Sequence, residues 1–158
     1  MSSHGRDDDA AARFIESFAG VMVDSGMPRM AARIFAYLLA ADDGSATAAE
    51  LAERLQASPA AVSGGVRYLA QVHLVLRERR PGQRKDTYTL AHDLWYESLG
   101  TRDQELNRWA VVARRGVEAV GEQTPAGLRL AETARFFDFL RVELKEVMER
   151  WHQQEGRR

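Results

Sequence analysis

A short basic segment between residues 75 and 90 holds the side chains of this sequence that are best suited to bind an anion. Its cations fall within nine positions, opposed there only by Glu78, and they are Arg77, Arg79, Arg80, Arg84 and Lys85. The hydrophobic pattern has period two on both sides of a Pro-Gly pair, which predicts a β-hairpin with a basic tip. Cations at such a tip can reach a phosphate or enter a narrow minor groove.

The residues just before the hairpin predict a short helix with two different faces. Val62, Val66, Leu69 and His73 follow one another at spacings of four, three and four, which predicts a buried face with His73 as a core or boundary residue. The opposite face is small and polar, with Arg67 as its one arginine. Such a face fits a major groove, and arginine can bind guanine or a phosphate. A solvated surface helix would show the same pattern.

Two adjacent glycines inside this helix require a compensating role, since each costs about 1 kcal/mol relative to alanine. Gly64 falls on the polar face, where a missing side chain suits a close approach to DNA. Gly65 falls toward the apolar face, where it suits the close approach of another helix.

Six helices are predicted around these features. Ser58-Pro59 and a Thr47 to Glu50 capping box mark two of the helix starts. The predicted helices cover about residues 7–24, 28–41, 47–56, 58–72, 93–120 and 124–154, with the hairpin at 74–90.

The last predicted helix carries a seven-residue hydrophobic repeat, which predicts a coiled-coil seam. We expect this seam to form a dimer interface, because a long exposed apolar stripe is rare on soluble monomers. Its residues are Leu130, Phe137, Leu140, Leu144, Val147 and Trp151.

The order of elements, with the capping box, the 58–63 helix start and the basic 82–88 segment, resembles the MarR-type winged-helix regulators, within them the GbsR-like branch. The resemblance implies a mainly α fold with a small β-hairpin wing, in which a winged helix-turn-helix is joined to long dimerisation helices. In many members an aspartate braces the wing arginine, whereas Gln83 precedes Arg84 here.

The resemblance implies a cytoplasmic bacterial homodimer that binds a pseudo-palindromic operator in double-stranded DNA and acts as a repressor. We expect three regions: residues 1–26 as an N-terminal helix of the dimer interface, 27–92 as the DNA-binding domain, and 93–158 as the C-terminal dimerisation region. The expected DNA contacts are Thr47, Ser58, Ala60, Ser63, Gly64, Arg67, Gln71, Arg79, Arg80, Arg84 and Lys85.

Aromatic residues in the terminal helices suggest a pocket for a small lipophilic or aromatic effector, although the same spacing is typical of an ordinary core. The candidate effector-binding residues are Phe14, Phe18, Met22, Phe35, Trp95, Leu99 and Trp109.

Other functions find little support in the sequence. There is no cysteine, no transmembrane-length apolar run and no catalytic motif, and the four histidines lack metal-ligand spacing, so we expect no enzyme, metal, cofactor or membrane partner. The net charge is −1, but residues 45–92 hold 7 basic and 4 acidic groups. The alternative is a winged-helix protein-interaction module, an adaptor or anti-regulator that does not bind DNA.

Overall fold

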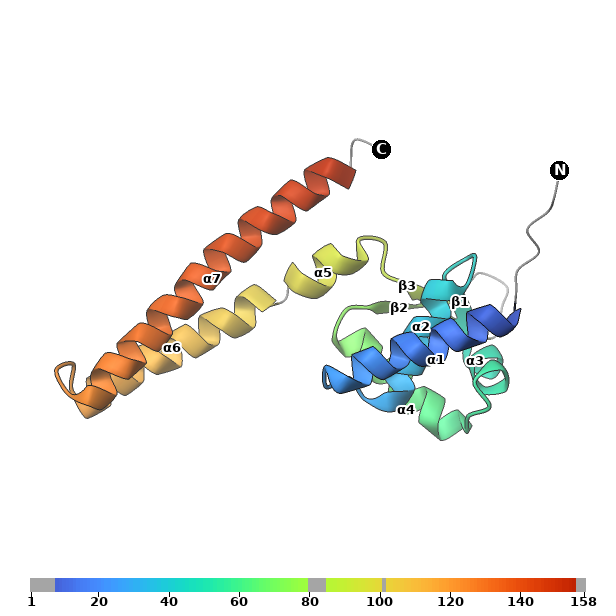
Figure 1. Cartoon of the computed structure of the whole chain (residues 1–158), viewed down its shortest axis with the longest axis horizontal. Helices are drawn as coiled ribbons and strands as arrows, with labels where there is room; N and C mark the ends of the chain where they lie inside the picture. The colour runs from blue at the N-terminus through green and yellow to red at the C-terminus, as the bar shows by residue number, and fades with distance from the viewer. Residues whose placement is uncertain (1–7, 80–84, 101, 156–158) are drawn as a thin grey trace. The chain divides into compact units, whose positions relative to one another are not determined.

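The computed structural model describes residues 8–79, 85–100 and 102–155. The chain divides into two compact units, Met1–Leu94 and Trp95–Arg158, which are described separately below. The elements of both are labelled in Figure 1. No helix in the described parts of the chain is long and apolar enough to cross a membrane.

The first unit is a small helical domain with a three-stranded sheet. Its elements are α1 (Asp8–Asp24), α2 (Arg29–Ala40), β1 (Ser45–Thr47), α3 (Ala48–Arg54), α4 (Pro59–Gln71), β2 (Val75–Arg79) and β3 (Asp86–Leu90). This order of helices followed by an antiparallel hairpin is that of a winged helix-turn-helix, as the sequence predicted.

The predicted start signals of α3 and α4 are both present. At α3 the Thr47 hydroxyl accepts a hydrogen bond from the Glu50 backbone N–H, and the Glu50 carboxylate accepts one from the Thr47 backbone N–H. At α4 the Ser58 hydroxyl accepts a bond from the Ala61 backbone N–H, with Pro59 as the first helical residue. The caps satisfy backbone donors that have no partner within the helix.

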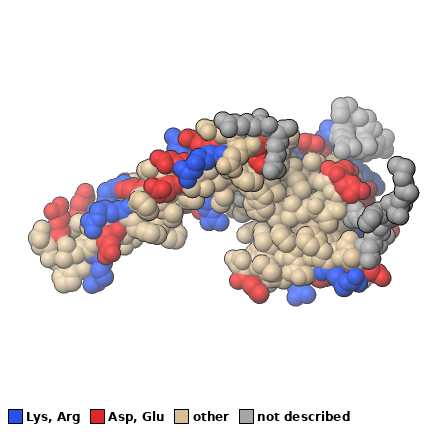
Figure 2. Space-filling view, turned by 45° about the horizontal axis from the view of Figure 1, so that its top comes forward, with Lys and Arg blue, Asp and Glu red and all other residues tan. Residues whose placement is uncertain are grey.

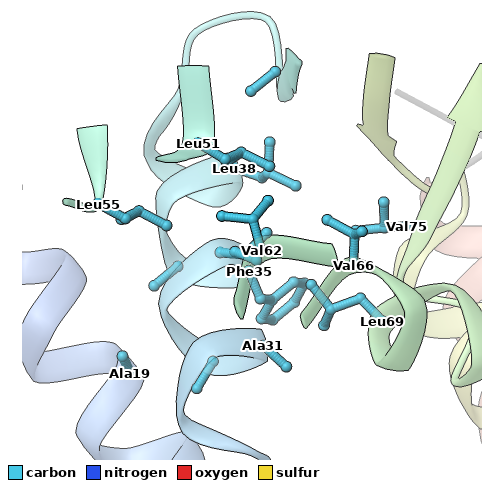
Figure 3. Packing of buried hydrophobic residues seen from close by; sticks show 14 of the residues in the cluster. Ala19, Ala31, Phe35, Leu38, Leu51, Leu55, Val62, Val66, Leu69 and Val75 are labelled. Atoms are coloured by element: carbon cyan, nitrogen blue, oxygen red, sulfur yellow. The ribbon is translucent and has the colours of Figure 1, made fainter. Parts of the chain in front are cut away.

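The hydrophobic core of this unit lies between α2 and α4. Phe35 of α2 is fully buried, as are Val62 and Leu69 of α4, and Figure 3 shows the three side chains together with Val66. Helix α1 covers the other side of α2 through Ile15 and Ala19, among others. The buried face of α4 therefore fixes which residues that helix turns to solvent.

The sheet has the strand order β1-β3-β2, with both neighbouring pairs antiparallel. The hairpin pairs Val75 with Leu90 and Arg79 with Asp86, within the limits that the sequence predicted. Strand β1 was not predicted, because its three residues carry no period-two pattern of their own. It forms by pairing with β3, where Ala46 lies opposite Tyr88.

His73 does not belong to the apolar face of α4, contrary to the sequence prediction. The helix ends at Gln71, and His73 follows it with φ +60° and an exposed side chain. The Leu74 backbone N–H donates to the Leu69 carbonyl oxygen at 2.9 Å, which closes the helix end as in a Schellman motif. The prediction extended the four-residue spacing to His73, but the helix ends before this residue.

The second unit contains α6 (Arg102–Val120), α7 (Pro125–Glu155) and all of α5 (Leu94–Gly100) except its first residue. The sequence predicted one helix over 93–120, and the structure has two, the first ending at Gly100, a residue type that disfavours helix continuation. Helices α6 and α7 lie side by side (Figure 1), and Thr124 caps α7 by accepting a hydrogen bond from the Gly127 backbone N–H.

Candidate nucleic-acid interface

The outward face of α4 has the composition that the sequence predicted. Val62, Gly65, Val66 and Leu69 are buried. The five predicted DNA-contact residues of this helix are all exposed, and they are Ala60, Ser63, Gly64, Arg67 and Gln71. The structure therefore brings these five together on one exposed face, where small side chains surround a single guanidinium group.

The two glycines of α4 have different surroundings. A Cβ atom on Gly65 would collide with α2, whereas nothing lies within 4 Å of the place where a Cβ on Gly64 would be. The absence of a side chain at position 65 therefore permits the close packing of α2 and α4. At position 64 it leaves the helix backbone open to an incoming molecule.

The end of the hairpin nearest its tip is held by an ion pair between the two strands. The Arg77 Nε donates a hydrogen bond of 2.8 Å to Asp86 Oδ2, and Nη2 contacts the same oxygen. This bond, with the charge of Asp86, raises the pKa of Arg77 above its ordinary value. Arg79 and Lys85 are exposed. Arg80 and Arg84 lie outside the described residues.

Thr47 and Ser58, two further predicted contacts, already have structural partners. Both hydroxyls cap helices, and the Thr47 hydroxyl also donates to the Glu50 carboxylate at 2.8 Å. The hydrogen bonds from Thr47 hold the pKa of Glu50 below its ordinary value. Any contact that these two residues make with DNA would add to the capping role.

Arg33 is a residue of this unit to which the sequence analysis gave no functional role. Its Nε donates to Glu16 Oε1 of α1 at 2.9 Å, and Nη2 lies 2.8 Å from the same oxygen. Its Nη1 donates to the carbonyl oxygen of Leu55, the last residue before the turn between α3 and α4, at 3.1 Å. One arginine on a helix gives no sequence signal for such a bridge.

The candidate effector-binding residues are distributed over both units. Phe14, Phe18 and Phe35 form a chain of ring contacts, with centroids 5.6 Å and 6.3 Å apart, which ends in the fully buried Phe35. Phe18 and Met22 pack against the same core. In this unit the aromatic stripe therefore contributes to ordinary hydrophobic packing.

In the second unit, a pocket of 380 Å³ lies among α5, α6 and α7. Its apolar walls include Leu99, one of the predicted effector contacts, with Leu144 and Met148 of α7. Arg141 lies at its edge, with Nε donating to Asp103 Oδ1 at 2.9 Å and Nη1 donating to the Asn107 side-chain oxygen at 2.8 Å. The bond from Arg141 lowers the pKa of Asp103, against a smaller effect of burial.

The predicted seam of α7 divides between two faces. Leu130 packs at Gly116 of α6, and the Phe137 ring meets Trp109 of α6 edge to face, with centroids 5.1 Å apart. Val147 and Trp151 are 46% and 45% exposed. Part of the seam is thus used within the chain, and an apolar stripe remains on the outer side of α7.

The charge distribution of the second unit does not favour binding of a polyanion such as DNA. Figure 2 shows acidic and basic residues interspersed along the α6–α7 pair on the face in view. Two ion pairs join these helices, Arg114 with Asp138 and Arg141 with Asp103. In each pair the arginine charge is balanced by an acidic group of the same unit. The predicted cationic DNA contacts that the structure describes, Arg67, Arg79 and Lys85, are exposed and lie in the first unit.

Comparison with known proteins identifies the family of both parts of the chain. Residues 25–86 match the model of the MarR family, and residues 93–154 match that of the MmpR5-like MarR family transcriptional regulators. The chain belongs to the MarR family of transcriptional regulators. The GbsR-like branch stays a prediction.

Two similar proteins are both described as transcriptional regulators. The HTH-type transcriptional regulator MmpR5 of Mycobacterium tuberculosis is 24% identical over 144 residues, which cover 90% of this chain and 87% of that protein. A crystal structure described as that of a transcriptional regulator superposes with a TM-score of 0.82 at 23% identity, over 91% of this chain and 99% of the other. The second likeness shows that the two proteins share a fold over almost the whole chain.

Proposed function

We propose that this MarR-family protein is a homodimeric repressor that binds a pseudo-palindromic DNA operator. The observation that carries the proposal is the exposed face of α4, with small side chains around Arg67 and the open backbone at Gly64. A helix of this form can enter a major groove, and a bidentate arginine can distinguish guanine from other bases. The basic hairpin, with Arg79 and Lys85, supplies cations for phosphates.

The dimer is supported by the apolar surface of the second unit. Trp109 and Val112 of α6 and Phe136 of α7 are each more than half exposed, and the Phe136 ring contacts that of Phe137. Exposed aromatic groups that gather on one pair of helices are typical of an interaction surface. A second copy of the chain would cover them and would place two recognition helices about 34 Å apart, one turn of DNA.

The effector in this proposal is a small lipophilic or aromatic molecule. The pocket among α5, α6 and α7 has a volume within the range of small-molecule sites, and its walls include Leu99, Leu144 and Met148. Binding there would alter the dimerisation helices and, through them, the spacing of the recognition helices. The corresponding measurement is operator affinity against the concentration of a lipophilic compound.

A gel-shift series at increasing salt tests DNA binding. The probe is a duplex that the wild-type protein selects from a random pool, beside DNA from upstream of its own gene. Binding through phosphates must weaken steeply with salt, because each neutralised phosphate releases counterions. A chain that selects no duplex and binds neither DNA would instead fit the protein-interaction module.

A further inference from the structure

Arg33 connects three helices of the first unit with one guanidinium group. Its α-carbon lies on α2, two of its nitrogens contact Glu16 on α1, and the third nitrogen donates to the Leu55 carbonyl oxygen at the end of α3. The Arg33 side chain is only 22% exposed, whereas that of Glu16 is 53% exposed. The inner part of this bridge is therefore the bond to the Leu55 carbonyl.

The Leu55 carbonyl belongs to the turn that sets the direction of α4. Leu55 is the C-cap of α3, and Gln56 follows with φ +49°. The Ala57 backbone N–H returns to the Ala52 carbonyl oxygen at 2.9 Å, and the next residue, Ser58, caps α4. Only two residues, Gln56 and Ala57, lie between the cap of one helix and the cap of the next. A displacement at Leu55 would therefore reach α4 with little loop to absorb it.

The chemistry of this bond suits arginine and not lysine. The carbonyl groups at a helix C-terminus carry partial negative charge, which favours a cation there. The planar guanidinium has donors in a fixed fork, so it can bond a carboxylate on one side and a carbonyl on another. A lysine at the same position would keep the charge but would offer a single ammonium group to two acceptors.

We propose that Arg33 is a positioning residue for operator recognition. It holds the turn between α3 and α4 at the angle that presents the α4 face to the groove, and it ties that turn to α1 through Glu16. This inference rests on the proposed DNA binding. Because α1 is one of the helices expected at the dimer interface, the bridge also links that interface to α4, the proposed recognition helix.

The Arg33→Lys variant tests this role at constant net charge. Affinity is measured for the selected operator and for a random duplex, at a temperature well below the melting transition. We expect the ratio of the two affinities to fall about tenfold, the effect of a lost charge-assisted hydrogen bond, while binding to random DNA changes little. The matched control is Arg54→Lys, an exposed arginine at the end of α3 beside the same bridge, which should leave the ratio unchanged.

The outcomes separate this inference from the proposed function. An unchanged ratio in Arg33→Lys, with only a lower melting temperature, would show that Arg33 stabilises the fold and does not position α4. A wild-type protein that binds no DNA would overturn the proposed function and this inference together. Should Arg33→Lys fail to fold, Glu16→Gln decides, because Glu16 holds the two nitrogens that orient the guanidinium toward Leu55. A partial loss of the ratio supports the bridge, and an unchanged ratio overturns the tie to α1.

Discussion

A Cβ atom at Gly65 of α4 would lie 2.6 Å from Ile34 Cδ1 of α2. The same atom would lie 3.2 Å from the Ala31 backbone nitrogen, which cannot move aside as a side chain can. Helices α2 and α4 therefore meet at a distance that only glycine at this position allows. Since α4 carries the proposed recognition face, this contact fixes where that face lies relative to the rest of the domain.

Alanine substitution should separate the two glycines of α4. Gly65→Ala is expected to destabilise the protein by about 1–3 kcal/mol, because the methyl group overpacks the contact with α2. Gly64→Ala should stabilise it by up to about 1 kcal/mol, since its Cβ meets nothing and alanine favours a helix. Urea denaturation measures both.

The Gly64→Ala protein should at the same time bind its operator less tightly, because the added methyl group separates the helix backbone from the DNA. If the variant is stabilised but keeps full operator affinity, Gly64 does not lie at the DNA interface.

Two cationic positions should differ in how they act on DNA. Arg67→Ala is expected to cost about 1–3 kcal/mol on the operator and much less on random DNA, as for a lost base contact. Lys85→Ala should weaken binding to both DNAs alike and lower the salt slope by about one unit, as for a phosphate contact. If Arg67→Ala loses the same affinity on both DNAs, Arg67 contacts only the DNA phosphate backbone and reads no base.

The capping box of α3 predicts an acid-sensitive contribution to stability. Thr47→Ala should cost about 1 kcal/mol at neutral pH. The pKa of Glu50 is lower in the folded protein than in the unfolded chain, so its contribution is present above the unfolded value and is lost as the pH falls through the folded one. Glu50→Gln should thus be less stable than wild type at pH 7, and the difference should shrink at acidic pH, as measured by thermal unfolding. A difference that is independent of pH would contradict this assignment.

Two valines on α7 test the dimer interface. Val147 belongs to the predicted seam, and Val142, which is also exposed, lies five residues away and therefore points in a different direction. Val147→Glu should dissociate the dimer in sedimentation at micromolar concentration, whereas Val142→Glu should leave it intact. A wild-type monomer at that concentration would refute the dimer itself.

Much of the first unit was predictable because its signals are local. The capping box at Thr47 and the Ser58-Pro59 start depend on residues within one turn of helix, and each occurs where it was expected. The buried positions Val62, Val66 and Leu69 follow from helical period alone. Such features survive in any fold that keeps the helix.

Features that depend on distant residues escaped the sequence analysis. Strand β1 exists because β3 offers it a partner, and the Arg33 bridge exists because α1 and the end of α3 come within reach of one side chain. The seam on α7 divides because α7 packs alongside α6, where Leu130 contacts Gly116 and Phe137 contacts Trp109. His73 was misplaced because helical spacing was continued past Gln71, the last residue of α4.

Thr47 is both the last residue of β1 and the N-cap of α3, so two unrelated demands fall on one side chain. A strand favours a β-branched residue, and a cap needs a short side chain with an oxygen. Valine meets the first demand and serine the second, while threonine meets both. The junction between the sheet and α3 therefore depends on this one residue, and variation there should be far narrower than at its exposed neighbours Ala48 and Ala49.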